Sequence, residues 1–151
     1  MIVDLDVATA LNVPEKSWFE LCASVVPCED PDAELSIRLV DETEGRELNE
    51  TYRKRTGATN ILSFPCEVPE GVPCHTLGDL VICAPLVEQE AREQGKTTEA
   101  HWAHLVIHGI LHLQGLDHQE EDEARRMESM EVEILARLGY PNPYENENDS
   151  L

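Results

Sequence analysis

The chain has 151 residues, of which 41% are hydrophobic, and this is enough for one compact domain with its own core. A formal net charge of −20 excludes indiscriminate binding to nucleic-acid backbones, because an acidic surface repels phosphates at long range. The sequence also has no run of about 18 apolar residues, which excludes a membrane-spanning helix.

Apolar periodicity predicts the elements of the N-terminal half. Residues 3–7 alternate between apolar and acidic side chains, as in a strand with one covered face. Residues 14–26 carry an apolar stripe at helical spacing between two prolines, which predicts a helix. A second alternating strand is expected over residues 34–40, followed by a short helix that ends at the basic tripeptide of residues 53–55.

The second half of the chain predicts two more strands and three helices. The strands are expected over residues 60–64 and 78–84, with a loop that contains proline and glycine between them. Helices are expected over residues 85–94, 98–114 and 120–138, and each is followed by a glycine.

These elements indicate a single α+β domain, a small mixed sheet of about four strands packed with about five helices. The sequence does not give the strand order, since residues 41–55 and 65–77 can each connect strands in either sense. We expect the domain to occupy residues 1–140 and residues 141–151 to form an acidic, flexible tail.

The cysteines and the N-terminus predict the compartment. The five cysteines include no CxxC pair, and they are Cys22, Cys28, Cys66, Cys74 and Cys83. This pattern favours reduced thiols in a cytoplasmic protein over a disulfide framework, and we expect most of the thiols in the core. The N-terminus has no basic segment followed by a long apolar run, so we expect a cytoplasmic protein and not a secreted one.

The stretch HGILHLQGLDH, residues 108–118, predicts a metal site. His108 and His112 lie one turn apart on one helix face, where two imidazoles can reach one cation. His104 extends the same row, but three side chains along one straight face cannot surround a tetrahedral ion. Gly115 permits a left-handed helix end, so a chain that turns back there can bring His118 to the metal from the opposite side.

Three histidines leave the fourth position of a zinc ion open for water, as in catalytic and not structural sites. We therefore predict one Zn²⁺ ion, which can lower the pKa of its water to about 7. Asp117 is available to orient an imidazole by accepting a hydrogen bond from the ring nitrogen that does not bind the metal. Because a histidine on an apolar helix face usually has a structural role, we interpret His101 and His104 as helix-face residues and not as ligands.

Gly109 distinguishes this motif from the metal-binding motif of the zinc proteases. Inside a helix a glycine costs up to about 1 kcal/mol relative to alanine, so we expect another element or a substrate to approach closely there. The metzincin pattern HExxHxxGxxH has its general-base glutamate at this position, so peptidase activity by that mechanism is excluded. A phosphodiester instead needs a metal together with cationic stabilisation of the phosphoryl oxygens, a task that arginine suits.

The motif resembles the HGxLHLxGxDH signature of the YbeY family of bacterial endoribonucleases. The upstream segments LNETYR, TNILSFP and LGDLVI are similar to other blocks of that family, so the resemblance covers nearly the whole chain. It implies a zincin-like metal helix and a cytoplasmic, metal-dependent endoribonuclease that is specific for single strands. It further implies a role in ribosomal RNA maturation, at the 3′ end of 16S rRNA, and in ribosome quality control.

Carried over by position, the resemblance implies His108, His112 and His118 as zinc ligands and Arg53 as the basic residue at the catalytic cleft. The implied partners are single-stranded RNA or rRNA and the ribosome or ribosome-associated proteins, with no DNA and no membrane. One departure is visible, because many family members have an aspartate where this chain has Asn60. A carboxylate role is therefore absent at this position, although an amide can still hold a loop.

Our mechanistic hypothesis is that zinc polarises a phosphoryl oxygen or activates water while Arg53 neutralises charge on the scissile phosphate. Asp117, Asp79 or a metal-bound hydroxide takes the proton, and the sequence does not choose among them. We interpret Asp79, which follows Gly78, as a turn residue in preference to a catalytic one.

Two other functions remain open from the sequence. The chain can be a metal-dependent hydrolase of another substrate, such as a small phosphoester or a peptide. It can also be a ribosome-assembly binding module with a structural zinc. The acidic charge indicates that RNA contact is confined to the cleft or assisted by a ribosome-associated partner.

Overall fold

The computed structural model describes residues 1–53, 57, 59–66, 68, 71–72, 74–115 and 120–144. Within these residues the strands are β1 (Ile2–Ala8), β2 (Glu34–Val40), β3 (Ile61–Pro65) and β4 (Thr76–Cys83). The helices are α1 (Lys16–Ser24), α2 (Glu42–Leu48), the π-helical turn η1 (Asn49–Arg53), α3 (Ala84–Gln94), α4 (Thr98–Leu113) and α5 (Glu121–Arg137). The prediction of a single α+β domain with a four-stranded mixed sheet and five helices is confirmed for the described part of the chain.

The strand order, which the sequence left open, is β1-β2-β4-β3. β2 runs parallel to both β1 and β4, whereas β3 is antiparallel to β4. Leu80 in β4 pairs with Ile37 of β2 on one side and with Ser63 of β3 on the other. β2 and β4 are therefore the central strands, and β3 forms an edge of the sheet. This order leaves the outer side of β3 available to line a cleft.

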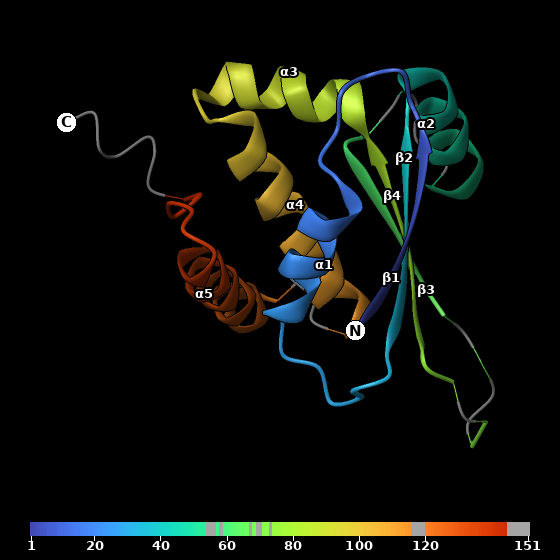
Figure 1. Ribbon diagram of the computed structural model, residues 1–151, viewed down its shortest axis with the longest axis vertical. Coiled ribbons are helices and arrows are strands. Elements are labelled where there is room, and N and C mark those ends of the chain that lie inside the picture. The colour runs from blue at the N-terminus through green and yellow to red at the C-terminus, as the bar shows by residue number, and fades with distance from the viewer. Residues whose placement is uncertain are drawn as a thin grey trace.

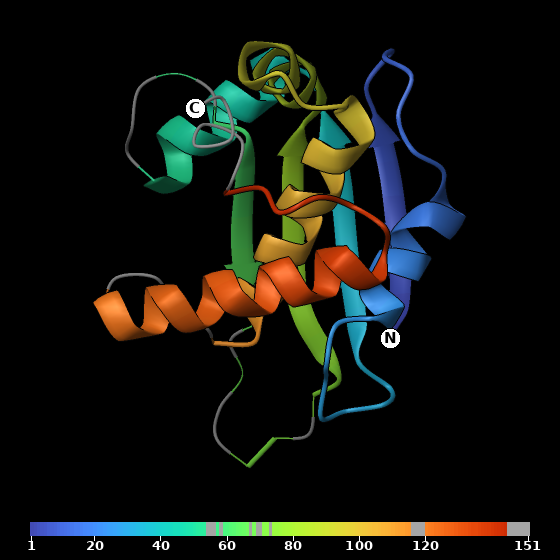
Figure 2. The same ribbon diagram turned by 90° about the vertical axis from the view of Figure 1, so that its left-hand side faces the viewer.

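The helices cover the two faces of the sheet unequally. α4 packs along one face, and α1 and α5 pack against α4, with α5 crossing it on the side away from the sheet (Figures 1 and 2). α2 lies on the opposite face near one end of the sheet (Figure 1). The larger apolar core therefore lies between the sheet and α4, where Leu80, Ile82 and Ile107 are fully buried. A smaller cluster that includes Val81 lies on the α2 side.

Gly109 sets how closely α4 approaches the sheet. A Cβ at this position would lie 2.8 Å from Leu80 Cδ2 and 2.9 Å from Ile61 Cδ1. The expected close approach is therefore confirmed, and the approaching elements are β4 and β3. The helix ends at Leu113, and Gly115, two residues later, has a left-handed φ of 95° as predicted. Together these glycines place the histidine-bearing turn of α4 beside the edge strand.

The cysteines differ from the prediction. Only Cys22 and Cys83 are buried, whereas Cys28 is half-buried and Cys66 and Cys74 are exposed, so the expectation that most lie in the core is wrong. Cys66 and Cys74 flank a connection outside the sheet, where the apolar periodicity that places a residue in the core does not apply.

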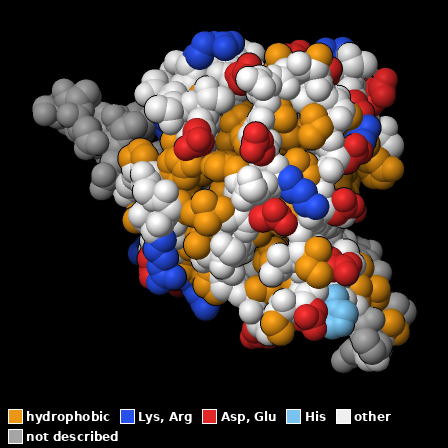
Figure 3. Space-filling model, viewed as in Figure 1, with side chains coloured by type: hydrophobic (Ala, Val, Ile, Leu, Met, Phe, Trp, Pro, Cys, Tyr) orange, Lys and Arg blue, Asp and Glu red, His pale blue; other side chains and the backbone are white. Residues whose placement is uncertain are grey.

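Acidic side chains are scattered among apolar ones over one face of the molecule (Figure 3). None of the helices in the described ranges is both long and apolar enough to cross a bilayer. The domain boundary near residue 140 stays a prediction, since Tyr144 still contacts Glu131 of α5 while residues 145–151 lie outside the described part.

Candidate active site

A cleft of about 460 Å³ lies between the edge strand β3 and the C-terminal half of α4. Tyr52 of η1 contributes to its lining. The remaining lining residues are Thr59, Asn60, Ile61, Leu62, Ser63, Phe64, His108 and His112. The cleft thus combines an edge strand, an aromatic ring and two imidazoles.

His108 and His112 project from α4 one helical turn apart, and both line this cleft. Their rings are nearly parallel, with an interplanar angle of 9° and centroids 6.5 Å apart. Both side chains are partly buried, so they can be reached from the cleft. Neutral imidazoles arranged in this way are suitable ligands for one cation.

Glu131 lies behind His108, and sequence reasoning missed it. This carboxylate is fully buried and accepts hydrogen bonds from His108 Nδ1 at 2.9 Å and His104 Nε2 at 2.8 Å. The Tyr144 hydroxyl also donates to it. Burial raises the pKa of Glu131, but the hydrogen bonds from His104, His108 and Tyr144 outweigh burial and lower the pKa to about 2.

The ionised Glu131 fixes the tautomer of His108. Since Nδ1 donates its proton to the carboxylate, Nε2 is the nitrogen of the neutral ring that carries the lone pair a metal ligand needs. A signal for this residue exists in the sequence, because Glu131 lies midway between Met127 and Leu135 on the buried stripe of α5. An acidic residue at such a position needs a partner in the core.

His104 and His101 have structural partners, in agreement with their interpretation as helix-face residues. His104 shares Glu131 with His108. His101 is 3% exposed, and its Nε2 lies 2.9 Å from Glu90 Oε1. The same carboxylate accepts a hydrogen bond from Asn60 Nδ2 at 3.0 Å, so the Asn60 amide ties the start of β3 to α3.

Several predicted site residues fall outside the described part of the chain. His118 and Asp117 are among them, as are Lys54 and Arg55 of the basic tripeptide. Arg53 ends η1 directly after Tyr52, which places its backbone beside the cleft, but its side chain is also outside the described part. The roles predicted for His118, Asp117 and Arg53 stay predictions.

The interpretation of Asp79 as a turn residue is wrong. It lies within β4, which begins at Thr76, and it pairs with Ser36 and Phe64. Leu80 packs under Gly109 of α4, and consecutive strand residues face opposite sides of a sheet. Asp79 therefore faces away from α4 and is not placed to accept a proton at the histidines.

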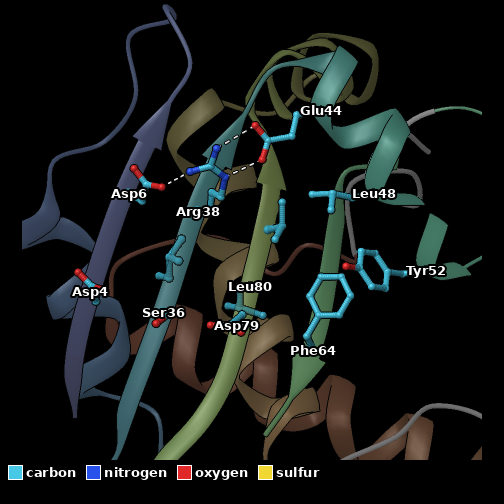
Figure 4. Close-up of a pocket in the computed structure, with 12 residues that line it drawn as sticks. Asp4, Asp6, Ser36, Arg38, Glu44, Leu48, Tyr52, Phe64, Asp79 and Leu80 are labelled. Carbon is cyan, nitrogen blue, oxygen red and sulfur yellow. Dashed lines mark hydrogen bonds and ion pairs between the residues drawn. The ribbon is translucent and has the colours of Figure 1, made fainter. Parts of the chain in front are cut away.

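Asp79 instead lines a second cavity, of about 620 Å³, on the other face of the sheet (Figure 4). The Arg38 guanidinium in this cavity forms ion pairs with Asp6 and, at 2.6 Å, with Glu44. These carboxylates already neutralise Arg38, and none of the described residues that line the cavity is a histidine. The chemistry expected of a metal-assisted site is therefore in the cleft beside α4, although it is the smaller of the two.

Comparisons with known proteins define the class. The family model described as Endoribonuclease YbeY matches residues 7–139. The chain is 56% identical over 152 residues to the Endoribonuclease YbeY of Pseudomonas entomophila (strain L48), covering 99% of this chain and 97% of that protein. It is 59% identical over 137 residues to the Endoribonuclease YbeY of Methylococcus capsulatus, covering 91% of each.

A solved structure agrees with the fold. The solution structure of TM1509 from Thermotoga maritima matches with a TM-score of 0.59 and 27% sequence identity, covering 91% of this chain and 92% of that one. The matches define an endoribonuclease, a hydrolase of phosphodiester bonds. More specifically, the chain belongs to the YbeY endoribonuclease family, as its motifs predicted.

Proposed function

We propose that this chain cleaves single-stranded RNA in the cleft beside α4, with His108, His112 and His118 as the ligands of one zinc ion. In this proposal the chain acts in the cytoplasm, in maturation of the 16S rRNA 3′ end and in ribosome quality control. The observation that carries the proposal is the pair of parallel imidazoles of His108 and His112 in the cleft, supported from behind by Glu131.

The donor set fits zinc. The YbeY family is metal-dependent, and imidazole nitrogen is a preferred zinc ligand. The carboxylate of Glu131 on the Nδ1–H of His108 matches the carboxylate–histidine–metal arrangement that orients metal ligands. When bound, zinc supplies a Lewis acid for a phosphoryl oxygen of the substrate.

The other groups of the cleft support an RNA substrate. Tyr52 is 63% exposed and packs edge-to-face on Phe64, with ring centroids 5.4 Å apart. Exposed aromatic faces stack the splayed bases of single-stranded RNA, which duplex RNA cannot offer. In the proposal Arg53, which follows Tyr52, pairs with the scissile phosphate and neutralises the charge that develops there.

The net charge of −20 is consistent with the ribosomal part of the proposal. Because the acidic surface repels RNA at long range, productive contact needs a local cationic site or a partner that holds the RNA in place. A ribosome or a ribosome-associated protein can supply that partner.

Two variants test the proposal. Arg53→Ala should abolish cleavage of single-stranded RNA by the purified protein while leaving its zinc content unchanged. His118→Ala should lose both zinc and cleavage while its circular dichroism spectrum stays folded. An unfolded His118→Ala protein would support a binding module with a structural zinc, and unchanged cleavage by Arg53→Ala would favour a hydrolase that acts on another substrate.

A further inference from the structure

Two exposed thiols face each other where β3 and β4 are connected. Cys66 directly follows β3, Cys74 is separated from β4 only by His75, and their Sγ atoms are 3.3 Å apart. We propose that Cys66 and Cys74 are a redox site that forms a reversible intramolecular disulfide when the protein meets a hydroperoxide. This inference does not depend on the RNA substrate or on the zinc site.

Backbone hydrogen bonds hold Cys66 in place. Its N–H donates to the Leu77 carbonyl at 3.1 Å, which extends the pairing of β3 with β4 by one step. The preceding residue pairs with Gly78, where an added Cβ would overlap the carbonyl oxygen of Phe64. Only glycine permits this close approach, so the end of the ladder beside Cys66 is tightly constrained.

The segment that contains Cys74 is anchored to β2, on the other side of β4 from β3. The carbonyl of its neighbour His75 accepts a hydrogen bond from the Glu34 N–H at 2.8 Å, which ties this segment to β2. A disulfide bond is about 2.0 Å long, so the sulfur atoms must approach each other by only about 1 Å. Side-chain rotation can provide that movement while both backbone anchors remain.

The two thiols differ in a way that suits stepwise oxidation. The pKa of Cys74 is lowered, chiefly by the hydrogen bond between the two sulfur atoms and secondarily by a backbone hydrogen bond at Thr76. The pKa of Cys66 is raised by the same hydrogen bond. In the proposal Cys74 is the attacking thiolate and Cys66 the resolving thiol, and the two serine variants test this order.

The reaction balances with hydrogen peroxide as the oxidant. The Cys74 thiolate attacks one peroxide oxygen, the O–O bond breaks, and the departing hydroxide takes a proton to give water and Cys74 sulfenic acid. The Cys66 sulfur then attacks the sulfenic sulfur and displaces its hydroxyl, which leaves as a second water with the proton of the Cys66 thiol. Two thiols are oxidised to one disulfide while one peroxide is reduced to two waters.

The remaining cysteines do not compete. Burial raises the pKa of Cys22 to about 12 and also raises that of Cys83, so both stay protonated and shielded. Cys28 is half-buried, and its thiol donates to the Asp30 carbonyl at 3.4 Å. Cys28→Ser is therefore the matched control.

The test treats the reduced, full-length protein with stoichiometric hydrogen peroxide and maps the products by mass spectrometry. The wild type and Cys28→Ser should lose two hydrogen atoms and yield a peptide cross-linked between Cys66 and Cys74, and dithiothreitol should reverse both changes. Cys66→Ser should stop at a Cys74 sulfenic acid that a cyclic diketone traps, whereas Cys74→Ser should react much more slowly.

Several results would overturn the proposal. They are an unchanged wild-type mass, a cross-link through a different cysteine pair or between two chains, and direct over-oxidation of Cys74 in the wild type. Equal sulfenic-acid trapping in the wild type and Cys66→Ser would also exclude Cys66 as the resolving thiol. Serine differs from cysteine by one atom and both positions are exposed, so circular dichroism should show the variants folded.

Discussion

Glu131 connects the buried interior of the protein with the histidines of the cleft. It accepts hydrogen bonds from His104 and His108 and from the Tyr144 hydroxyl, and it has no exposed surface. A buried carboxylate without partners would be costly, so these donors both stabilise Glu131 and are oriented by it. The position of His108 therefore depends on a residue of another helix.

Glu131→Gln should weaken zinc binding by about 10- to 100-fold, because a glutamine amide cannot accept from both imidazoles as a carboxylate does. The measurement is a competition titration with a chromophoric chelator, independent of RNA cleavage. The control is Glu128→Gln, at an exposed position of the same helix, which should bind zinc like the wild type. Equal affinities in all three proteins would remove Glu131 from the account of the site.

His101 gives a prediction on pH. Burial lowers its pKa, against the opposing effect of Glu90, so the folded protein favours the neutral imidazole. The folded-state pKa lies below the unfolded value of about 6.5, so this contribution is present above that pH and is lost as the pH falls through it. In urea unfolding, His101→Gln should therefore lose less stability than the wild type between about pH 7 and pH 5.

His75 provides a control, because its contribution to stability should change with pH in the opposite direction to that of His101. The hydrogen bond to Asp30 raises the pKa of His75, so its stabilising contribution is present at low pH and lost as the pH rises. His75→Gln should thus steepen the loss of stability on acidification, whereas His101→Gln should reduce it. Parallel curves for the wild type and His101→Gln would show that His101 is not held neutral.

At the scale of elements, the site depends on how α4 lies against β3 and β4. Gly109 permits this contact, and the next turn of the helix carries His112 into the cleft. A larger residue would push the helix away from the edge strand and widen the space between the imidazoles and the cleft wall.

Gly109→Ala should destabilise the protein by about 1–2 kcal/mol, because overpacking against Leu80 and Ile61 outweighs the gain of up to about 1 kcal/mol in helix propensity. Gly45→Ala is the matched control, since a Cβ there meets nothing nearer than 3.5 Å within helix α2. It should stabilise the protein by several tenths of a kcal/mol in urea unfolding. The same sign for both variants would contradict this account of Gly109.

The sequence predicted the helices and strands better than it predicted which of them pair or pack with each other. Alternation and helical periodicity placed all four strands and the histidine-bearing helix α4 because these signals are local. The left-handed end at Gly115 and the close approach at Gly109 followed from the chemistry of glycine. The strand order depends on contacts between distant segments, and the inward-facing Glu131 gains its meaning only when α5 crosses α4. Asp79 was misinterpreted because the turn preference of a Gly–Asp pair is a local signal, whereas its place inside β4 depends on pairing with β2 and β3.

At the scale of the whole molecule, the charge of −20 predicts an unusual dependence on salt. Most proteins that bind nucleic acids lose affinity as salt rises, because cations on their surface are screened. Here the long-range interaction with RNA is repulsive, so kcat/KM for a short single-stranded RNA should rise as ionic strength increases from low values to about 0.1 M. A steep fall over that range would show that a local basic site dominates the encounter.

The coordination of zinc in the loaded protein tests the central claim most directly. Zinc K-edge X-ray absorption should show three imidazole nitrogens at about 2.0–2.1 Å and one further light-atom ligand from solvent, with no sulfur. In His118→Ala one imidazole should be missing from the spectrum. A wild-type spectrum with a fourth protein ligand, a sulfur ligand or only two imidazoles would contradict the three-histidine site with one open position.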